Sequence, residues 1–188
     1  MLVQIFAGFF ADVSRILCTF AVMKTIGILS DTHAYWDDRF AKYFAECDEI
    51  WHAGDIGSQD VYDKLSQIAP VIAVAGNIDD SIMRRKLGVL QIWETDGVKV
   101  MMTHIGGYPG RYKPGIAFKI MAQRPNIFIS GHSHILKVMY DRENDLLHIN
   151  PGAAGVYGCQ PVRTLIRLKI DNGSIKDLEV IELRSNQQ

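Results

Sequence analysis

Short runs of apolar residues recur along the chain and predict buried strands. The runs are rich in Val and Ile, and each is too short for a typical helix. The expected strands cover residues 25–29, 50–52, 71–75, 98–102 and 126–129. Between them, residues 38–47 and 59–68 have apolar side chains at helical spacing, and a third helix is expected over 115–123, before Pro125.

The second half of the sequence has a different pattern, in which turn residues predict antiparallel hairpins. Their expected positions are Asp96-Gly97, the polar segment 141–145 and Asn172-Gly173. Residues 165–170 alternate between two faces, which is typical of a strand with one buried and one solvent-facing side. Strands and helices alternate in the first half, so we expect an α/β fold in which helices cover two packed sheets.

Composition and charge are those of an ordinary globular domain. The 188 residues are 48% hydrophobic and carry a formal net charge of -1, which suits one buried core and gives no general attraction to nucleic acid or to an anionic membrane. The cysteines Cys18, Cys47 and Cys159 are odd in number and lack CxxC spacing. We therefore expect free thiols and a cytoplasmic protein.

The first 22 residues are apolar but are interrupted by Asp12 and Arg15. This pattern fits neither a signal peptide nor a membrane-spanning helix. Because Met23 directly precedes the first strand, we interpret residues 1–22 as an extension upstream of the true start. A short membrane-binding or partner-binding helix is the alternative. A single domain is expected over residues 23–184, followed by a tail at 185–188.

The candidate chemistry lies in loops that directly follow five of the apolar runs. These loops read SDTH, AGD, AGN, THIGG and SGHSH. Open α/β sheets bind ligands at the edge where such loops meet, so we expect their donor side chains to converge. The expected set is Asp31, His33, Asp55, Asn77, His104, His132 and His134. Glycines precede three of these residues and are expected to allow tight turns there.

The donor set predicts two metal ions rather than one. Structural zinc sites are tetrahedral and commonly use sulfur, whereas this set has seven donors and no sulfur. With one carboxylate bridging, the other donors divide into two groups of imidazole, carboxylate and amide. Such groups suit manganese, iron, zinc or nickel better than magnesium, and we expect two divalent ions, foremost manganese. Five of the six histidines lie in or beside these loops, and His148 is the exception.

The ordered motifs resemble those of the calcineurin-like metallophosphoesterase superfamily. They are Asp31-Thr-His33, Gly54-Asp55, Gly76-Asn77, His104 and Gly131-His132-Ser-His134. The lack of large insertions and the segment Asn150-Pro151-Gly152 resemble its small prokaryotic phosphodiesterase branch. The resemblance implies a four-layer α/β/β/α sandwich of two mixed sheets flanked by helices.

The resemblance also implies a role for each donor. One ion would be held by Asp31, His33, Asp55 and His134, and the other by Asp55, Asn77, His104 and His132. Asp55 would bridge the ions, and a water or hydroxide between them would attack phosphorus. Asp55, Asn77 and His104 would then be catalytic residues.

The chain departs from the family pattern after the Gly-Asn pair. Many members have a histidine there that protonates the leaving oxygen, but this chain has Ile78. Loss of a general acid typically costs about 10² to 10⁴ in rate and affects poor leaving groups most. Nearby, Asp79 either orients a metal-bound water or makes a structural hydrogen bond. His52 either supports the metal ligands from behind or is purely structural.

A second departure follows His104, where that branch often has a further histidine. Gly106 and Gly107 stand there instead. The next loop carries Arg111 and Lys113, which either supply positive charge for a substrate or face solvent. The basic pair Arg84 and Arg85 is expected on a solvated helix face.

Together these features predict a phosphodiesterase that acts on a small or activated phosphate diester. Two metal ions can stabilise a leaving group without a protein acid. One alternative is a phosphomonoesterase or nucleotide phosphatase. The other is a non-catalytic protein-binding scaffold, because a eukaryotic retromer subunit shares the fold, but all seven donor positions are filled here. No nucleic-acid or membrane partner is expected, and the resemblance implies a homodimer or small homo-oligomer.

Overall fold

The computed structural model describes residues 23–184, and within them the chain forms ten strands and four helices. The strands are β1 (Lys24–Leu29), β2 (Glu49–His52), β3 (Val71–Ala73), β4 (Leu90–Thr95), β5 (Val98–Thr103), β6 (Ile127–Ile129), β7 (Leu136–Asp141), β8 (Leu146–Pro151), β9 (Arg163–Asp171) and β10 (Ser174–Leu183). The helices are α1 (Asp38–Phe44), α2 (Gln59–Ile68), α3 (Ser81–Leu87) and α4 (Pro114–Gln123). The predictions for residues 1–22 and 185–188 lie outside the described residues.

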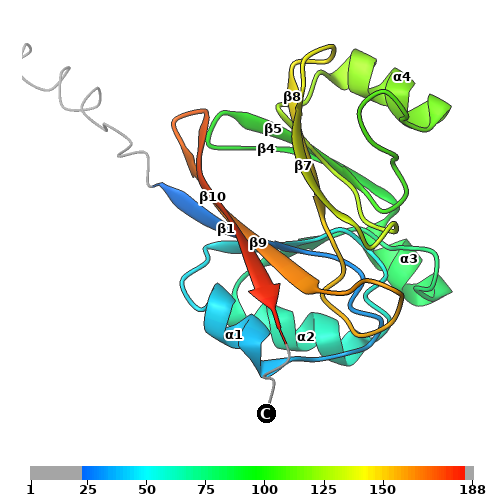
Figure 1. Ribbon diagram of the computed structural model, residues 1–188, viewed down its shortest axis with the longest axis vertical. Helices are drawn as coiled ribbons and strands as arrows, with labels where there is room; N and C mark the ends of the chain where they lie inside the picture. The colour runs from blue at the N-terminus through cyan, green and yellow to red at the C-terminus, as the bar shows by residue number, and fades with distance from the viewer. Residues whose placement is uncertain (1–22, 185–188) are drawn as a thin grey trace, which may run out of the picture.

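The strands form two mixed sheets of five strands each (Figure 1). The first sheet has the order β10-β9-β1-β2-β3, in which β1, β2 and β3 are parallel and β9 and β10 are antiparallel to their neighbours. The second has the order β4-β5-β6-β8-β7, with a parallel centre and an antiparallel strand at each edge. The carboxyl ends of the parallel strands therefore lie at one edge of each sheet.

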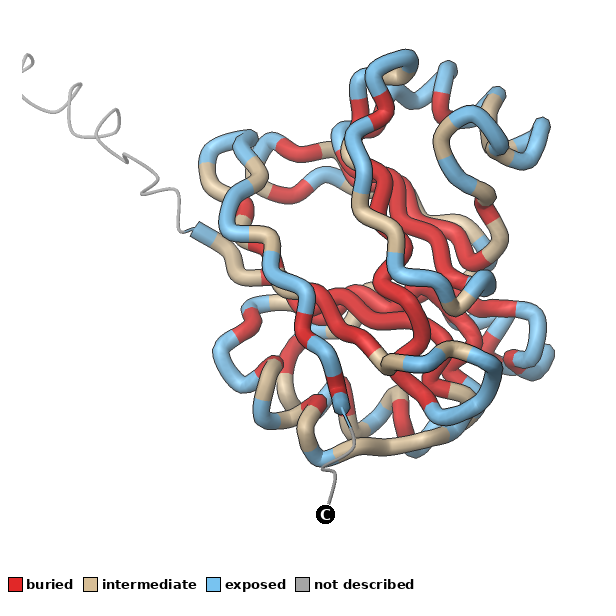
Figure 2. Tube along the Cα trace, viewed as in Figure 1, coloured by how far each residue is buried: buried red, intermediate tan, exposed pale blue. Residues whose placement is uncertain are grey.

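Three apolar clusters define four layers. Side chains such as Ile28, Leu168 and Val100 pack between the two sheets. A second cluster joins the first sheet to α1, α2 and α3, and a third joins the second sheet to α4 through Ile120. Buried positions follow the sheets in Figure 2. The expected α/β/β/α sandwich is confirmed.

The hairpin turns were predicted correctly, because their sequences suit the backbone that such turns require. Asp96 and Gly97 both have positive φ, of 43° and 77°, and so do Asn172 and Gly173, at 47° and 77°. Two-residue hairpin loops of this kind need positive φ at both positions, which Asn, Asp and Gly adopt most readily. Both turns fix the register of strands in the two sheets.

Several boundaries differ from the predictions. The first helix ends at Phe44 rather than at residue 47, because the chain turns to bury Cys47 before β2. Strand β3 ends at Ala73 rather than at residue 75, because the Ala75 N–H donates to Gly88 O instead of to the neighbouring strand.

The prediction of a solvent-facing side for β9 was only partly right. Arg167 and Lys169 are half-buried, but Leu165 on the same face is fully buried. Leu165 packs in the apolar cluster shared with the helices, so the helix layer covers that part of the sheet. None of the helices within residues 23–184 is long and apolar enough to cross a membrane.

Candidate metal centre

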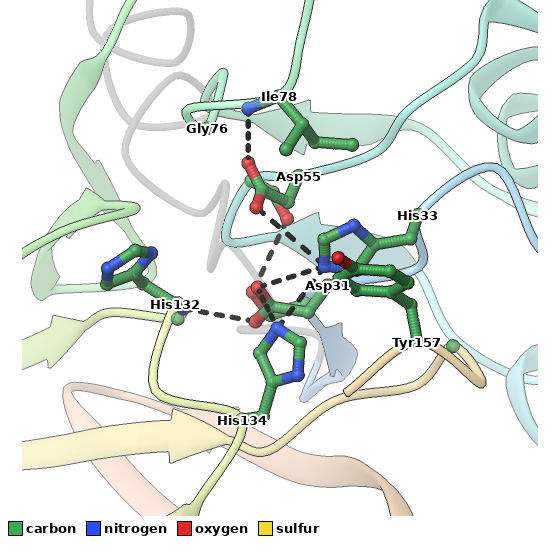
Figure 3. A network of polar contacts seen from close by, with 12 residues as sticks. Asp31, His33, Asp55, Gly76, Ile78, His132, His134 and Tyr157 are labelled. Carbon is green, nitrogen blue, oxygen red and sulfur yellow. Dashed lines mark hydrogen bonds and ion pairs between the residues drawn. The ribbon is translucent and has the colours of Figure 1, made fainter. Parts of the chain in front are cut away.

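The predicted donor loops meet at the strand ends of both sheets. In the first sheet, the loops after β1 and β2 are joined by hydrogen bonds from Asp31 N to Gly54 O and from His33 N to Asp55 O, both 3.0 Å. Between the sheets, the His132 N–H donates to Asp31 Oδ2 over 3.1 Å. These bonds hold the polar loops of the two sheets face to face (Figure 3).

The donor atoms form two adjacent groups, each with ligand atoms that lie within 4.8 Å of one another. One group is Asp31, His33 and His134, and the other is Asp55, His104 and His132. Asn77 joins the second group, since its Oδ1 lies 3.1 Å from His104 Nε2. All seven side chains of the predicted set are therefore brought together, although their roles remain predictions.

Asp55 lies between the two groups. Its Oδ2 is 3.3 Å from His104 Nε2 in one group and 3.8 Å from His33 Nε2 in the other. Its second oxygen, Oδ1, accepts a hydrogen bond of 3.0 Å from the Ile78 N–H. One oxygen of this carboxylate is therefore held by the backbone, while the other faces imidazole nitrogens of both groups.

The donor atoms suit divalent ions, because they are oxygen and nitrogen atoms and because one buried oxygen has no hydrogen-bond partner among the described residues. Asp31 Oδ1 is buried and accepts no hydrogen bond from the described residues. It lies 3.2 Å from His134 Nε2, and the Nε2 atoms of His33 and His134 are themselves only 3.2 Å apart. A buried carboxylate oxygen without a partner and converging imidazole nitrogens are what a cation between them would satisfy.

Two of the imidazoles are oriented by carbonyl oxygens on their outer side. His104 Nδ1 donates to Ala53 O over 2.8 Å, and His134 Nδ1 donates to Gln160 Oε1 over 3.1 Å. The Gln160 amide is itself fixed, because its Nε2 donates to the carbonyls of Gly155 and Tyr157. With Nδ1 protonated, each Nε2 presents its lone pair to the donor group.

Backbone strain is concentrated at the donors. Five of the seven have positive φ: Asp31 at 55°, His33 at 48°, Asp55 at 54°, His132 at 67° and His134 at 58°. Non-glycine residues in this region cost of order 1–3 kcal/mol each, and they cluster at functional sites. The sequence predicted tight turns at the preceding glycines, but the turns lie largely at the donors themselves.

Glycines serve mainly to let loops approach one another. Gly54 does have positive φ, at 94°, as expected. The φ values of Gly76 and Gly131 are not in the positive region, but a Cβ at Gly76 would lie 2.0 Å from Asp55 Oδ1, and one at Gly131 would lie 2.0 Å from Ser30 Oγ. At these two positions, glycine is required by the close approach of a neighbouring loop rather than by a positive φ.

Charge interactions in the centre shift several pKa values. Burial opposes ionisation of Asp55, but the adjacent His104 ring and a hydrogen bond from the Ile78 amide give it a net lowered pKa. Burial also opposes protonation of His104, yet the adjacent carboxylates of Asp55 and Asp31 raise its pKa. The adjacent Asp31 carboxylate raises the pKa of His134, whereas burial lowers those of His33 and His132. Protons on His104 and His134 would compete with metal at low pH.

His52 and Asp79 lie behind the donors. The Gly54 N–H donates to His52 Nδ1, and His52 Nε2 contacts Thr32 Oγ1 over 3.0 Å, so the buried ring joins two donor loops. Burial lowers the pKa of His52 to about 4, which keeps it neutral. The Asp79 carboxylate accepts from the N–H groups of Gly57 and Gly76 at 2.7 and 2.8 Å. These contacts are compatible with both predicted roles of each side chain, so the roles of His52 and Asp79 stay predictions.

The basic residues have separate positions. Arg111 is exposed and makes no side-chain hydrogen bond with the described residues, whereas Lys113 lines a cavity beside His132. Arg84 is exposed on α3, but it is not simply solvated, because it donates to the carbonyls of Gly76 and Asp79. Neither these Arg84 hydrogen bonds nor the contact between Gln160 and His134 could be predicted from the sequence, since both depend on segments that meet only in the fold.

The contact at Gly76 yields a direct test of this geometry. We expect Gly76→Ala to displace the Asp55 carboxylate and to reduce manganese affinity at least about tenfold, because the added methyl would overlap Asp55 Oδ1. Isothermal titration calorimetry measures this affinity. Gly115→Ala is the matched control, since a Cβ there meets nothing within 4 Å. Unchanged affinity in Gly76→Ala would contradict the geometry.

Gln160 provides a second test. Removing the acceptor of His134 Nδ1–H with Gln160→Ala should weaken manganese binding about 10–100-fold, as is typical when the outer partner of a metal-binding histidine is lost. Gln123→Ala, at an exposed position of α4, should leave the affinity unchanged. Equal affinities in the two variants would show that the amide does not orient the imidazole.

Comparison with known proteins agrees with the architecture and the motifs. Residues 23–173 match the calcineurin-like phosphoesterase superfamily domain. A probable metallophosphoesterase of Methanocaldococcus jannaschii is 32% identical over 157 residues, which cover 78% of this chain and 76% of that protein.

Among solved structures, a novel archaeal phosphodiesterase is 24% identical with a TM-score of 0.64, and the match covers 85% of this chain and 99% of that one. Wild-type Vps29 of Entamoeba histolytica, complexed with zinc, is 19% identical with the same TM-score of 0.64 and the same coverages of 85% and 99%. Both likenesses show the fold alone. The fold, the ordered motifs and the match over residues 23–173 identify this chain as a member of the calcineurin-like phosphoesterase superfamily.

Proposed function

We propose that this protein is a phosphodiesterase that uses two divalent metal ions, foremost manganese. The observation that carries the proposal is the position of Asp55, whose Oδ2 faces imidazole nitrogens of both donor groups at 3.3 and 3.8 Å. A single carboxylate placed in this way can join two ions into one centre. The proposed ligands are the seven residues expected from the sequence, with Asp55 shared.

The proposed role of each residue follows from its contacts. When bound, two such ions supply an acidified water as nucleophile and positive charge against the phosphoryl oxygens. Asp31 and Asp55 provide the buried negative charge that retains the ions. The Ile78 N–H holds Asp55 Oδ1 and so leaves Oδ2 facing the centre. Ala53 O and Gln160 Oε1 hold two imidazoles in the tautomer that can ligate.

The residue at position 78 favours phosphate esters that have an acidic leaving alcohol. The Ile78 side chain is 47% exposed beside Asn77 and cannot donate a proton, and its N–H is already bonded to Asp55. Esters with acidic leaving alcohols depend least on a general acid. A structural neighbour is described as an archaeal phosphodiesterase, which supports the proposed preference for a diester.

A phosphomonoesterase and a scaffold are the competing functions. A zinc complex of a Vps29 with this fold means that a filled metal site would not by itself distinguish an enzyme from a protein-sorting component. Hydrolysis must therefore be measured together with metal content.

The role of Asp55 is tested by two substitutions. Asp55→Ala and Asp55→Asn should each lower metal content to less than one ion per chain and reduce manganese-dependent hydrolysis by at least about 10³-fold, because the shared ligand is lost. The Asn variant keeps the shape and tolerates the left-handed backbone. Asp60→Ala, which removes an exposed carboxylate on α2, should behave as wild type. Full activity in either Asp55 variant would refute the bridging assignment.

The substrate class is tested by a paired assay with manganese. We expect kcat/KM for bis(nitrophenyl) phosphate to exceed that for nitrophenyl phosphate, because the proposed substrate is a diester and neither ester needs a proton donor for its acidic nitrophenol leaving group. The two esters have the same leaving group, so the ratio of their kcat/KM values reports whether the enzyme prefers phosphorus with a second ester group. A strong preference for the monoester would favour the alternative function, and hydrolysis of neither would favour the scaffold.

A further inference from the structure

A cavity of about 210 Å³ adjoins the metal centre on the side of the second sheet. It lies between the loop that follows β5 and the strands β7 and β8. Among its lining residues, only His132 also belongs to the two donor groups. A substrate phosphate at the centre would therefore have one of its ester arms next to this cavity.

The walls of the cavity are apolar and carry positive but no negative charge. Tyr108, Ile105 and Ile135 supply apolar surface, and Lys113 and Lys137 supply ammonium groups. Lys137 Nζ lies 3.7 Å from the centroid of the Tyr108 ring. None of the described residues that line the cavity is Asp or Glu. These walls suit a flat neutral or anionic group and disfavour a cation.

His148 is the unusual residue in this cavity. It projects from β8, is 1% exposed and has no hydrogen-bond partner at either ring nitrogen among the described residues. Burial, together with the nearby Lys137, lowers its pKa to about 4, so the ring is neutral and offers one donor and one acceptor. Its ring neighbours are Phe128 and Tyr112, which offer no partner to it. Leaving such a group unpaired costs about 1–3 kcal/mol, which a polar ligand would offset once a shift of the cavity wall exposes a ring nitrogen.

The size of the cavity limits what enters it. Pockets for whole drug-sized molecules have volumes of about 300–1,000 Å³, so this cavity has room for a single ring system. Gly106 and Gly107 shape it: a Cβ at Gly106 would lie 2.4 Å from Phe128 Cζ, and Gly107 has a φ of 82°. Only residues without side chains let this loop pack so closely against the second sheet.

We propose that this cavity binds a flat heteroaromatic ring of the nucleobase class, carried by the ester arm that stays on phosphorus. The ring would lie against Tyr108, and its polar edge would meet His148 and the two lysines. The inference rests on the proposed phosphodiesterase function and gives that function a substrate class, the nucleoside phosphodiesters. Binding energy from this non-reacting arm would raise kcat/KM.

Two diesters with the same leaving group test the proposal, namely the nitrophenyl ester of thymidine monophosphate and methyl nitrophenyl phosphate. With manganese, wild-type protein should show the higher kcat/KM on the thymidine ester. His148→Leu and Lys113→Ala should each lower that value about 3- to 10-fold, as expected for one lost hydrogen bond, and change the methyl ester less than about twofold. Lys119→Ala, an exposed lysine of α4 outside the cavity, is the matched control.

The outcomes distinguish a failure of the phosphodiesterase function from a failure of the ring-binding cavity. Hydrolysis of neither diester would overturn the phosphodiesterase function and the subsite with it. Hydrolysis of both with equal kcat/KM in wild type, or an equal fall on both in the variants, would overturn the subsite alone. His148→Leu should melt at or above the wild-type temperature, because it removes unpaired polar atoms from a buried position. If His148→Leu fails to fold, Lys113→Ala provides the same test at an exposed position.

Discussion

The structure depends on one constraint: the buried carboxylates of Asp31 and Asp55 must lie close together in one small volume. Asp31 Oδ1 and Asp55 Oδ2 lie 3.9 and 3.3 Å from the same atom, His104 Nε2, and their side chains are 0% and 3% exposed. Like charges so close together are unfavourable without compensating positive charge. Imidazoles supply part of that charge when protonated, and metal cations would supply all of it.

The rest of the centre can be understood as the means of holding these charges in place. Left-handed backbone at five donors turns their side chains inward, and Gly76 and Gly131 leave room for the carboxylates. Asp79 ties the Asp55 and Asn77 loops together through backbone amides. The sheets contribute stiffness, because every donor loop leaves a strand that is buried on at least one face. A strained loop can persist only on such a support.

The sequence predicted the fold and the set of converging residues because both depend on local patterns. Apolar runs define the strands, turn residues such as Asn172-Gly173 define the hairpins, and the donors directly follow the strands. What could not be predicted depends on contacts between distant segments. Nothing local in the sequence indicates that Gly76 faces Asp55, that Gln160 orients His134, or that the helix layer buries Leu165. His148 stood apart from the donor motifs, and only the structure places it in a cavity beside them.

The central claim is that one carboxylate joins two metal ions, and anomalous diffraction from crystals soaked with manganese tests it most directly. The account predicts two anomalous peaks about 3.5–4 Å apart, with the Asp55 carboxylate in contact with both. One peak would have His134 and Asp31 beside it, and the other His104 and His132. A single peak, or two peaks of which neither touches Asp55, would contradict the account.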